Sequence, residues 1–353
     1  MGRETATFHL AERPKGDIIP GQTFKLEKTA APTASDLKDG EILVEALYLS
    51  LDPAMRGWLN DTRSYVPPVA IGEKMRGAAI SRVLASKSAK VKEGDIVNAS
   101  VGWTEVGIVN EKQFEIIDLP EGSKITDGLG VLGLTGLTAY FGLSKIGVPK
   151  AGETVVVSGA AGATGSVVGQ ICKLKGCTVV GIAGSDDKCA WLKNELGFDA
   201  AINYKSATFK EDLVKATPKF IDIYWDNVGG EILELCLNRA AFRSRFIMCG
   251  SISGYNNPNR AAEKGIRNLF QVTVQRIRME GFIVFDHHEE YAAARKEIGG
   301  WMREGKLKRK ETVVKGGIEV ADKAIRDLFE GKNTGKLLVE VKAYEERVEG
   351  SKL

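Results

Sequence analysis

The stretch TVVVSGAAGATG at residues 154–165 decides the fold. A short valine-rich run leads directly into a glycine-rich turn, and apolar residues then recur at helical spacing between 167 and 174. The turn is a G-x-G-x-x-G pattern in which Ala160 replaces the first glycine. Gly162 would let the backbone approach a pyrophosphate, Gly165 would let the helix pack on the strand, and free amides at the helix start would bind the anion. The sequence therefore predicts a dinucleotide-binding loop, with a tight turn that binds nothing as the alternative.

Strand-like and helix-like segments alternate on the carboxyl side of this loop. Strands are expected at 154–158, 178–182, 201–202, 220–225, 245–249 and 279–285, and helices from 164 and at 188–196, 230–239, 260–270 and 290–303. Alternation of this kind indicates a parallel sheet with helical crossovers. About six strands are the complement of a doubly wound dinucleotide fold.

The segments on either side of this region indicate a second domain. Short runs that alternate apolar and polar residues, such as 41–48 and 95–99, predict a twisted β-rich domain. A chain of 353 residues also exceeds the usual size of one core. The strand-like run at 336–341 is expected to return to the first domain. The predicted domains are residues 1–135 for the first part of the β-rich domain, 136–310 for the nucleotide domain, and 311–353 for the return segment.

Composition weighs against several classes of protein. The net charge is +3 with both signs interspersed, and the basic run at 306–310 is interpreted as a solvated turn, so no nucleic-acid partner is expected. The longest apolar stretch, 129–143, is shorter than the roughly 20 residues that span a bilayer and predicts a core helix, so no membrane partner is expected. Three histidines and five cysteines show no zinc-ligand spacing, which predicts no metal.

Two features at the ends of the sequence bear on localisation. No charged-then-apolar signal segment stands at the N-terminus. The sequence ends in Ser351-Lys352-Leu353, the tripeptide that the peroxisomal import receptor reads. We expect a peroxisomal matrix protein that uses this receptor as a partner, with a cytoplasmic protein carrying a functionless tail as the alternative.

The tip of the second strand of the nucleotide domain predicts the cofactor. NAD-specific sites place a carboxylate there to bind the ribose 2′-hydroxyl, whereas this chain has Ser185 at the tip. Asp186 and Asp187 suit the first turn of the next helix, where negative charge is favoured. Lys188 and Ser185 could then meet a 2′-phosphate, with Tyr204 closing the pocket. The sequence favours NADP over NAD, although Lys188 taken alone would be a solvated lysine.

These residues and several outside the loop resemble the medium-chain dehydrogenase/reductase superfamily. Within it they are most similar to the zinc-independent leukotriene B4 12-hydroxydehydrogenase/prostaglandin reductase branch, which includes NADP-dependent alkenal double-bond reductases. The resemblance covers nearly the whole chain and rests on LSLDPAMRG at 49–57, GLTGLTAY at 133–140, AAGATG at 160–165, GIAGS at 181–185, NVGG at 227–230, CGSISGYN at 249–256 and GKNTGK at 331–336.

The resemblance implies a fold, a reaction and a set of contacts. The fold would be a Rossmann doubly wound parallel sheet inserted into a GroES-like β-rich domain. The enzyme would be a homodimer that uses NADPH/NADP+ without zinc on small α,β-unsaturated carbonyl compounds. The positions that match cofactor contacts of the family, together with Gly165 of the loop, are Thr138, Gly162, Ala163, Ser185, Lys188, Tyr204, Asn227, Cys249, Tyr255, Phe282, Val284, Asn333 and Gly335.

The chain departs from the family's patterns at three positions. The usual D-P-Y-M-R has Ala54 in place of tyrosine, plant members often have a tyrosine at the position of Ala78, and the usual S-Q-Y-N has Gly254 in place of glutamine. These smaller residues predict a roomier substrate pocket. The cofactor positions are unchanged.

Conjugate reduction delivers a hydride to the β-carbon and needs a hydrogen-bond donor at the carbonyl oxygen, where enolate charge develops. Tyr255, on the loop after the fifth strand, is the expected donor, assisted by the cofactor's ribose 2′-hydroxyl; a tyrosine that only fills space is the alternative. Tyr48, Tyr65 and Trp103 are candidates for the substrate pocket, although Tyr48 and Trp103 would also fit the core. Arg56 is expected to brace a loop.

Two other functions remain open on the sequence. A quinone oxidoreductase of the same superfamily would share the fold and the cofactor but pass the hydride to a quinone. A protein that binds NADPH without turnover is the second alternative, and retention of Tyr255 argues against it. A zinc alcohol dehydrogenase is disfavoured because its cysteine and histidine ligands have no counterparts.

Overall fold

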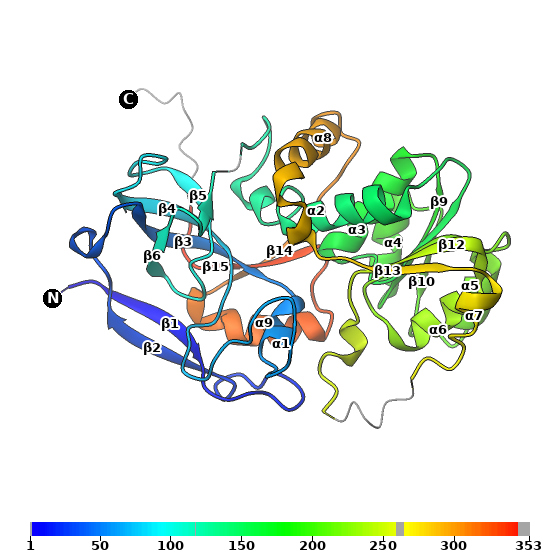
Figure 1. Ribbon diagram of the computed structural model, residues 1–353, viewed down its shortest axis with the longest axis horizontal. Coiled ribbons are helices and arrows are strands. Elements are labelled where there is room, and N and C mark those ends of the chain that lie inside the picture. Colours follow the sequence, from blue (N-terminus) through cyan, green and yellow to red (C-terminus); the bar gives the residue numbers. More distant parts are fainter. Residues whose placement is uncertain (1, 117, 259–264, 345–353) are drawn as a thin grey trace.

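The valine-rich run before the glycine turn forms the centre of a six-stranded parallel sheet (Figure 1). The computed structural model describes residues 2–116, 118–258 and 265–344. The strand order is β10-β9-β8-β11-β12-β13, which is the doubly wound arrangement that the sequence predicts. The strands are β8 (Thr154–Val157), β9 (Thr178–Ala183), β10 (Ala200–Asn203), β11 (Ile221–Asp226), β12 (Ala240–Met248) and β13 (Arg278–Gly281).

Helices cover both faces of this sheet, which is why its central strands are apolar on both sides. Val155 and Val157 pack in one core against α3 (Ala163–Leu174) and α4 (Asp186–Asn194). Val156 points to the opposite core, under α5 (Phe209–Ala216) and α6 (Gly230–Asn238). All three valines are fully buried. The first face also carries α2 (Leu134–Phe141), the π-helical turn Gly142–Gly147 and α8 (Tyr291–Arg303).

A second sheet of seven strands forms the other domain, with the order β14-β15-β3-β4-β5-β7 and β6 paired to β3. Beside it lies an antiparallel hairpin of β1 (Glu4–Leu10) and β2 (Phe24–Ala30). The strands of the large sheet are β3 (Glu41–Leu51), β4 (Ala79–Ser86), β5 (Ile96–Ala99), β6 (Val106–Asn110), β7 (Phe114–Glu115), β14 (Glu311–Lys315) and β15 (Lys336–Glu340). Its helices are α1 (Ala54–Trp58) and α9 (Ala321–Phe329).

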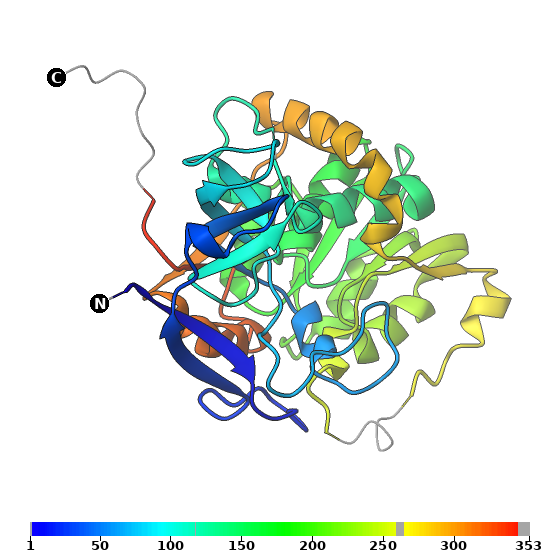
Figure 2. The ribbon, with the colours of Figure 1, turned by 60° about the vertical axis from the view of Figure 1, so that its left-hand side comes forward.

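The chain returns from the nucleotide domain to complete this second sheet. β15 pairs antiparallel with β3, with Leu338 opposite Ser50, and β14 lies parallel to β15. Figure 2 shows these strands at the red end of the colour scale beside the blue first domain. The α/β architecture, with a Rossmann-type sheet inserted into a β-rich domain, is therefore confirmed, while the residue boundaries of the domains stay a prediction.

A buried carboxylate in β3 forms ion pairs with the first and the last described segments of the β-rich domain. Glu45 in β3 is 1% exposed and forms ion pairs with Arg3, Arg82 and Lys342. Burial alone would raise the pKa of Glu45, but hydrogen bonds from Lys342, Arg82 and Arg3 outweigh it and lower the pKa to about 2. The charge of Glu45 thus stabilises the fold at neutral pH.

Three expectations about secondary structure need correction. The helix expected at 260–270 is wrong for 265–270, which form turns before the short α7 (Gln271–Val274); residues 259–264 lie outside the described part. Asn268 holds this turn by donating to the Glu234 carbonyl and to Asn238. The strand expected at 279–285 ends at Gly281, where its partner β12 also ends. The apolar stretch 129–143, expected to be a core helix, is helical only from Leu134. In addition, α5 was not predicted from the sequence.

Short 3-10 turns connect the remaining elements, at Ala34–Asp36, Ile125–Gly128, Ile252–Gly254, Val284–Glu290 and Ile318–Val320. Among the helices of the described residues, none has the length and apolar character needed to cross a bilayer.

Candidate active site

The glycine-rich turn has the geometry of an anion-binding loop. Gly159 follows β8 with a φ of +58°, and Gly162 precedes the first turn of α3, which no side chain caps. A Cβ on Gly165 would lie 2.5 Å from the Gly159 carbonyl oxygen, so only glycine lets α3 approach the turn this closely. The first amides of α3 are therefore available to an anion at the helix start.

The return segment lies against this turn. The amide of Gly335 donates to the Ala161 carbonyl at 2.8 Å, and Gly335 forms a parallel bridge with Gly162. Asn333 holds the segment by donating to the Gly335 carbonyl at 2.9 Å. Asn333 and Gly335, both predicted cofactor contacts, therefore border the loop in space although they follow it by about 170 positions in the sequence.

The tip of β9 carries the residues expected at a 2′-phosphate. Ser185 caps α4 by accepting from the Lys188 amide at 3.4 Å, and Asp186 and Asp187 occupy the first turn as expected. The Lys188 ammonium donates to the Gly331 carbonyl at 2.6 Å. Burial and the charge of Lys205 lower the pKa of Lys188, so an anion placed here would be favoured.

Tyr204 borders the same tip. It follows β10 and packs so closely on Gly184 that a Cβ there would lie 3.0 Å from the ring. Asp186 is held by the side chain of Asn203 at 2.8 Å. One oxygen of Asp186 is thus used by an amide donor, and Ser185, Lys188 and Tyr204 border the tip together.

The carboxyl end of β11 is fixed by a buried carboxylate. Asp226 Oδ1 accepts from Ser158 Oγ, the Tyr224 hydroxyl and the amides of Val228 and Gly229, at 2.8 to 3.0 Å. Burial raises the pKa of Asp226 although the amide bonds from Gly229 and Val228 lower it. The turn that begins at the predicted contact residue Asn227 is therefore rigid.

Asn227 and Cys249 lie at this end of the sheet. Asn227 Nδ2 donates to the Ser158 carbonyl at 2.7 Å, and Asn227 Oδ1 accepts from Trp225 Nε1 at 3.0 Å. The amide of Cys249 donates to the Asp226 carbonyl. Burial raises the pKa of the Cys249 thiol to about 12, so it stays protonated and can serve only as a neutral contact.

The loop after β12 carries Tyr255 next to the 3-10 turn Ile252–Gly254. The Tyr255 hydroxyl accepts from the Ser251 amide at 3.1 Å and donates to no acceptor among the described residues. Burial raises the pKa of Tyr255, the bond from Ser251 opposes this, and nearby Cys249 and Tyr65 raise it further. The hydroxyl is therefore protonated at neutral pH and retains a hydrogen to donate.

Of the three predicted pocket residues, Tyr65 is the one whose charge would raise the pKa of Tyr255. The Tyr65 hydroxyl accepts from Trp58 Nε1 at 3.0 Å, and its ring lies 6.4 Å from that of Phe285, centroid to centroid. Tyr65 and Trp58 come from the β-rich domain and Phe285 from the nucleotide domain. Neither Trp58 nor Phe285 was singled out from the sequence, because each belongs to a segment whose local pattern gives no sign of the other domain.

Trp103 is a core residue, so its assignment to the pocket is wrong. It is fully buried and packs against Phe8 and Phe24 at centroid distances of 5.8 and 5.0 Å. Large aromatic side chains of a small β-domain supply much of its apolar burial, which explains this placement. Tyr48 lies half-buried on β3, paired with Ile80 and Glu340, and packs on the cluster around Leu47.

The remaining predicted contacts lie on the helical face. Thr138 Oγ1 donates within α2 to Leu134 at 2.7 Å. The Phe282 ring meets Trp225 edge-on, with 5.9 Å between centroids. The Val284 carbonyl accepts from the Tyr291 hydroxyl at 3.1 Å, so one of its two acceptor positions is already used. Arg56 contacts backbone carbonyls of a neighbouring loop, as the sequence led us to expect.

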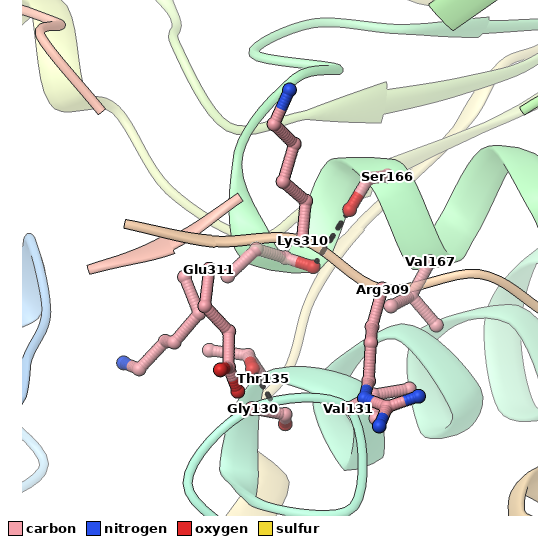
Figure 3. Close-up of a pocket in the computed structure, with 10 residues that line it drawn as sticks. Gly130, Val131, Thr135, Ser166, Val167, Arg309, Lys310 and Glu311 are labelled. Carbon is pink, nitrogen blue, oxygen red and sulfur yellow. Dashed lines mark hydrogen bonds between the residues drawn. The ribbon is translucent and has the colours of Figure 1, made fainter. Parts of the chain in front are cut away.

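A small cavity of about 10 Å³, enough for one water, lies behind the loop between α3 and β14 (Figure 3). Its wall includes Glu311 and Arg309, and Arg309 forms an ion pair with fully buried Asp127. Burial raises the pKa of Asp127 to about 6, although an amide bond from Lys124 and the charge of Arg309 lower it. This carboxyl therefore titrates just below neutral pH.

Two further predictions concern charge and metal. The basic residues of the 306–310 run have partners inside the molecule: Lys306 pairs with Glu304, Lys308 with Glu195 and Arg309 with Asp127, while Lys310 lies over the Trp191 ring. Across residues 2–116, 118–258 and 265–344, no three histidine, cysteine or acidic residues are grouped as a metal site would need.

A parallel sheet of the nucleotide-binding type, with an uncapped helix start after its glycine turn and aromatic residues that meet from two domains, is typical of an oxidoreductase that uses a dinucleotide cofactor. Comparison with known proteins agrees with this class. Residues 6–117 match the family model described as the N-terminal domain of oxidoreductase, and residues 163–298 match the one described as zinc-binding dehydrogenase.

Full-length relatives narrow the class further. The NADPH-dependent curcumin reductase of Escherichia coli is 40% identical over 94% of this chain and 95% of its own, and prostaglandin reductase 1 of Bos taurus is 40% identical over 90% and 97%. The NADP(+)-dependent 2-alkenal reductase of Nicotiana tabacum is 40% identical over 85% and 87%. The crystal structure of CurA from Vibrio vulnificus in complex with NADPH is 39% identical, with a TM-score of 0.89 over 96% of this chain and 100% of that one. The chain belongs to the medium-chain dehydrogenase/reductase superfamily, in the branch of the zinc-independent prostaglandin and alkenal reductases.

Proposed function

We propose that this protein uses NADPH to reduce the carbon–carbon double bond of small α,β-unsaturated aldehydes and ketones. The observation that carries the proposal is the Tyr255 hydroxyl, which is half-buried at the carboxyl end of the sheet, accepts from Ser251 and keeps its own hydrogen for a substrate. The names of the relatives support the same substrate class.

The residues present fit NADPH. The first amides of α3 would bind the pyrophosphate, and Lys188, Ser185 and Tyr204 would surround the 2′-phosphate. The tip of β9 carries Ser185 in place of the carboxylate that would bind a ribose 2′-hydroxyl, and one oxygen of Asp186 accepts from Asn203. Asn227, Cys249, Phe282 and Val284 would border the nicotinamide end.

When bound, NADPH supplies the hydride that adds to the β-carbon of the substrate. Tyr255 would donate a hydrogen bond to the carbonyl oxygen, where negative charge accumulates as the enolate forms. Its raised pKa keeps the donor protonated through neutral pH. Tyr65, Trp58 and Phe285 would exclude water from this region, and the α-carbon would take its proton from Tyr255 or from solvent.

The direct test follows NADPH absorbance with the purified protein and a panel of 2-alkenals, enones, quinones and saturated aldehydes. Oxidation with enals or enones, with a saturated carbonyl product, supports the proposal. Activity with quinones alone would favour the quinone oxidoreductase alternative, and tight NADPH binding without turnover would favour a binding protein.

Tyr255→Phe tests the proposed donor. Loss of one such donor typically lowers kcat about 100-fold or more. Tyr140→Phe is the matched control, because the Tyr140 hydroxyl bonds to Glu297 on α8 instead. Equal rates for the two variants would remove Tyr255 from the chemistry.

The protein is also proposed to be a homodimer. This rests on family resemblance, and it agrees with the place of β13 at one edge of the sheet formed by the described residues, next to β12, which carries exposed Phe242. Sedimentation of the purified protein as a monomer at micromolar concentration would refute it. The targeting prediction for Ser351-Lys352-Leu353 lies outside the described residues and stays a prediction; a fluorescent fusion that remains diffuse with or without this tripeptide would refute it.

A further inference from the structure

A hydrogen bond between the two domains ends beside Tyr255. Asn256 Nδ2 donates to Asp17 Oδ1 at 2.8 Å, joining the loop after β12 to the loop between β1 and β2. The two loops are also in close contact, because a Cβ on Gly16 would lie 3.5 Å from the Asn256 carbonyl oxygen. In Figures 1 and 2 the yellow-green segment after β12 lies beside the β-rich domain at this point.

The loop that carries Asp17 is firmly held in its own domain. Arg56, only 2% exposed, donates to the carbonyls of Pro14 and Gly16 at 3.0 and 2.9 Å. Ile18, next to Asp17, is buried in the core. Arg56 is thus the loop brace that its motif suggested, and it fixes the position at which Asp17 meets the other domain.

The segment on the other side of the bond is held together by its own hydrogen bonds. Tyr255 reaches back to the Ser251 amide through its hydroxyl, and the Asn257 amide closes a turn on the Gly254 carbonyl at 3.3 Å. Asn256 therefore holds the far end of the same turn that carries the Tyr255 hydroxyl. A displacement of Asn256 would be passed directly to that hydroxyl.

Open space borders the side chains of Asp17 and Asn256. A cleft of about 120 Å³ lies alongside, lined by Asp17 and Asn256 on one side and by Arg326, Phe329 and Glu330 of the α9 region on the other. Side chains next to open space have few atoms to restrain them. Among the described residues, this hydrogen bond adds to the close contact between Gly16 and the Asn256 backbone in holding this end of the loop.

We propose that Asp17 and Asn256 form an interdomain latch that positions Tyr255 for catalysis. Neither residue touches the reacting atoms in this proposal; both are positioning residues. The inference rests on the role proposed above for Tyr255, and it adds that the β-rich domain helps to set the place of a catalytic group carried by the nucleotide domain.

The test is a double-mutant cycle on the full-length, NADPH-bound enzyme, with Asp17→Ala, Asn256→Ala and both together. A bond to a charged acceptor at a solvent-accessible position is expected to be worth about fivefold in kcat for either single variant. The double variant should be no slower than the slower single variant, because both remove the same bond. The KM for NADPH should stay within about twofold, since the phosphate-binding residues are elsewhere.

Two further variants separate positioning from general damage. The exchanged pair, Asp17→Asn with Asn256→Asp, reverses donor and acceptor and should recover kcat to within about twofold of the native enzyme. The control Asp61→Ala removes a carboxylate that lies 4.0 Å from Arg13 at the same surface and should leave kcat unchanged. Additive single effects, or no recovery in the exchanged pair, would overturn the proposal.

Hydrogen exchange gives a readout that needs no turnover. In Asp17→Ala the amides of Ser251, Gly254 and Tyr255 should exchange faster than in the native, NADPH-bound protein, while peptides of the central sheet should not change. Unchanged exchange in this loop would overturn the latch. If the native enzyme reduces no enone, the proposed function fails separately, and exchange alone decides whether the latch exists.

Discussion

Replacing Lys188 by alanine should convert the enzyme from a preference for NADPH toward indifference between NADPH and NADH. Lys188 lies in the first turn of α4 at the tip of β9, where its amide donates to Ser185, and the nearby charge of Lys205 adds to the positive potential. A hydrogen bond between charged partners contributes about 1.5–3 kcal/mol, which corresponds to a loss of about 10- to 150-fold in kcat/KM for NADPH. The variant also loses the bond from Lys188 to the Gly331 carbonyl. That loss affects both cofactors equally, so the ratio of their kcat/KM values isolates the phosphate contact.

The assay measures kcat/KM for NADPH and for NADH at one ionic strength, because salt screens this interaction. Lys193→Ala is the matched control, since it removes a lysine from the last turn of the same helix, away from the tip. A ratio for Lys188→Ala that stays within about twofold of the native value would refute the assignment of the 2′-phosphate site. A fall in both values with an unchanged ratio would indicate instead that Lys188 only anchors the 331–335 segment.

Three stability experiments test other features of the fold. Glu45→Gln should lower the free energy of unfolding at pH 7 by about 2 kcal/mol. The lowered pKa of Glu45 implies roughly 3 kcal/mol, but its half-exposed partners reduce this value. Urea unfolding at several pH values should show that the difference in stability between the variant and the native protein vanishes as the pH falls from about 4.5 to 2. The carboxyl of Asp127 should affect stability in the opposite direction, because its pKa is raised to about 6. Its ionisation destabilises the fold as the pH rises from about 4 to 6, so Asp127→Asn should make the free energy of unfolding depend less on pH in this range. Gly335→Ala should lower the Tm more than Gly331→Ala. Both residues have φ near +70°, but only a Cβ at Gly335 would also lie 1.9 Å from the Lys310 carbonyl oxygen. Equal shifts in Tm would contradict this clash.

The sequence was most informative where a function depends on neighbours along the chain. The valine run and glycine turn at 154–165 specify a strand, a turn and a helix within a dozen residues, so their pattern contains the whole anion-binding motif. The same holds for the tip of β9, where Asp186 and Asp187 occupy the first turn of α4 as expected. The return of the chain was also predicted, because residues 336–341 are strand-like, and β15 does pair with β3.

Local pattern could not decide where bulky or polar side chains meet across the molecule. Trp103 and Tyr65 are both aromatic residues in the first domain, yet one is enclosed by Phe8 and Phe24 and the other faces Phe285 of the nucleotide domain. The expected helix at 260–270 failed for the described residues because a distant carbonyl on α6 holds Asn268 in a turn.

The sequence by itself indicated the two-domain architecture and the dinucleotide-binding loop through the short-range spacing of glycine, apolar and charged residues, and it indicated the family through resemblance to that family's motifs. The tertiary structure alone decided the contact between Tyr65 and Phe285 and the bond between Asp17 and Asn256. Residues separated by more than 200 positions carry no mutual signal in one sequence, and only the docking of the two domains brings their side chains within hydrogen-bonding distance.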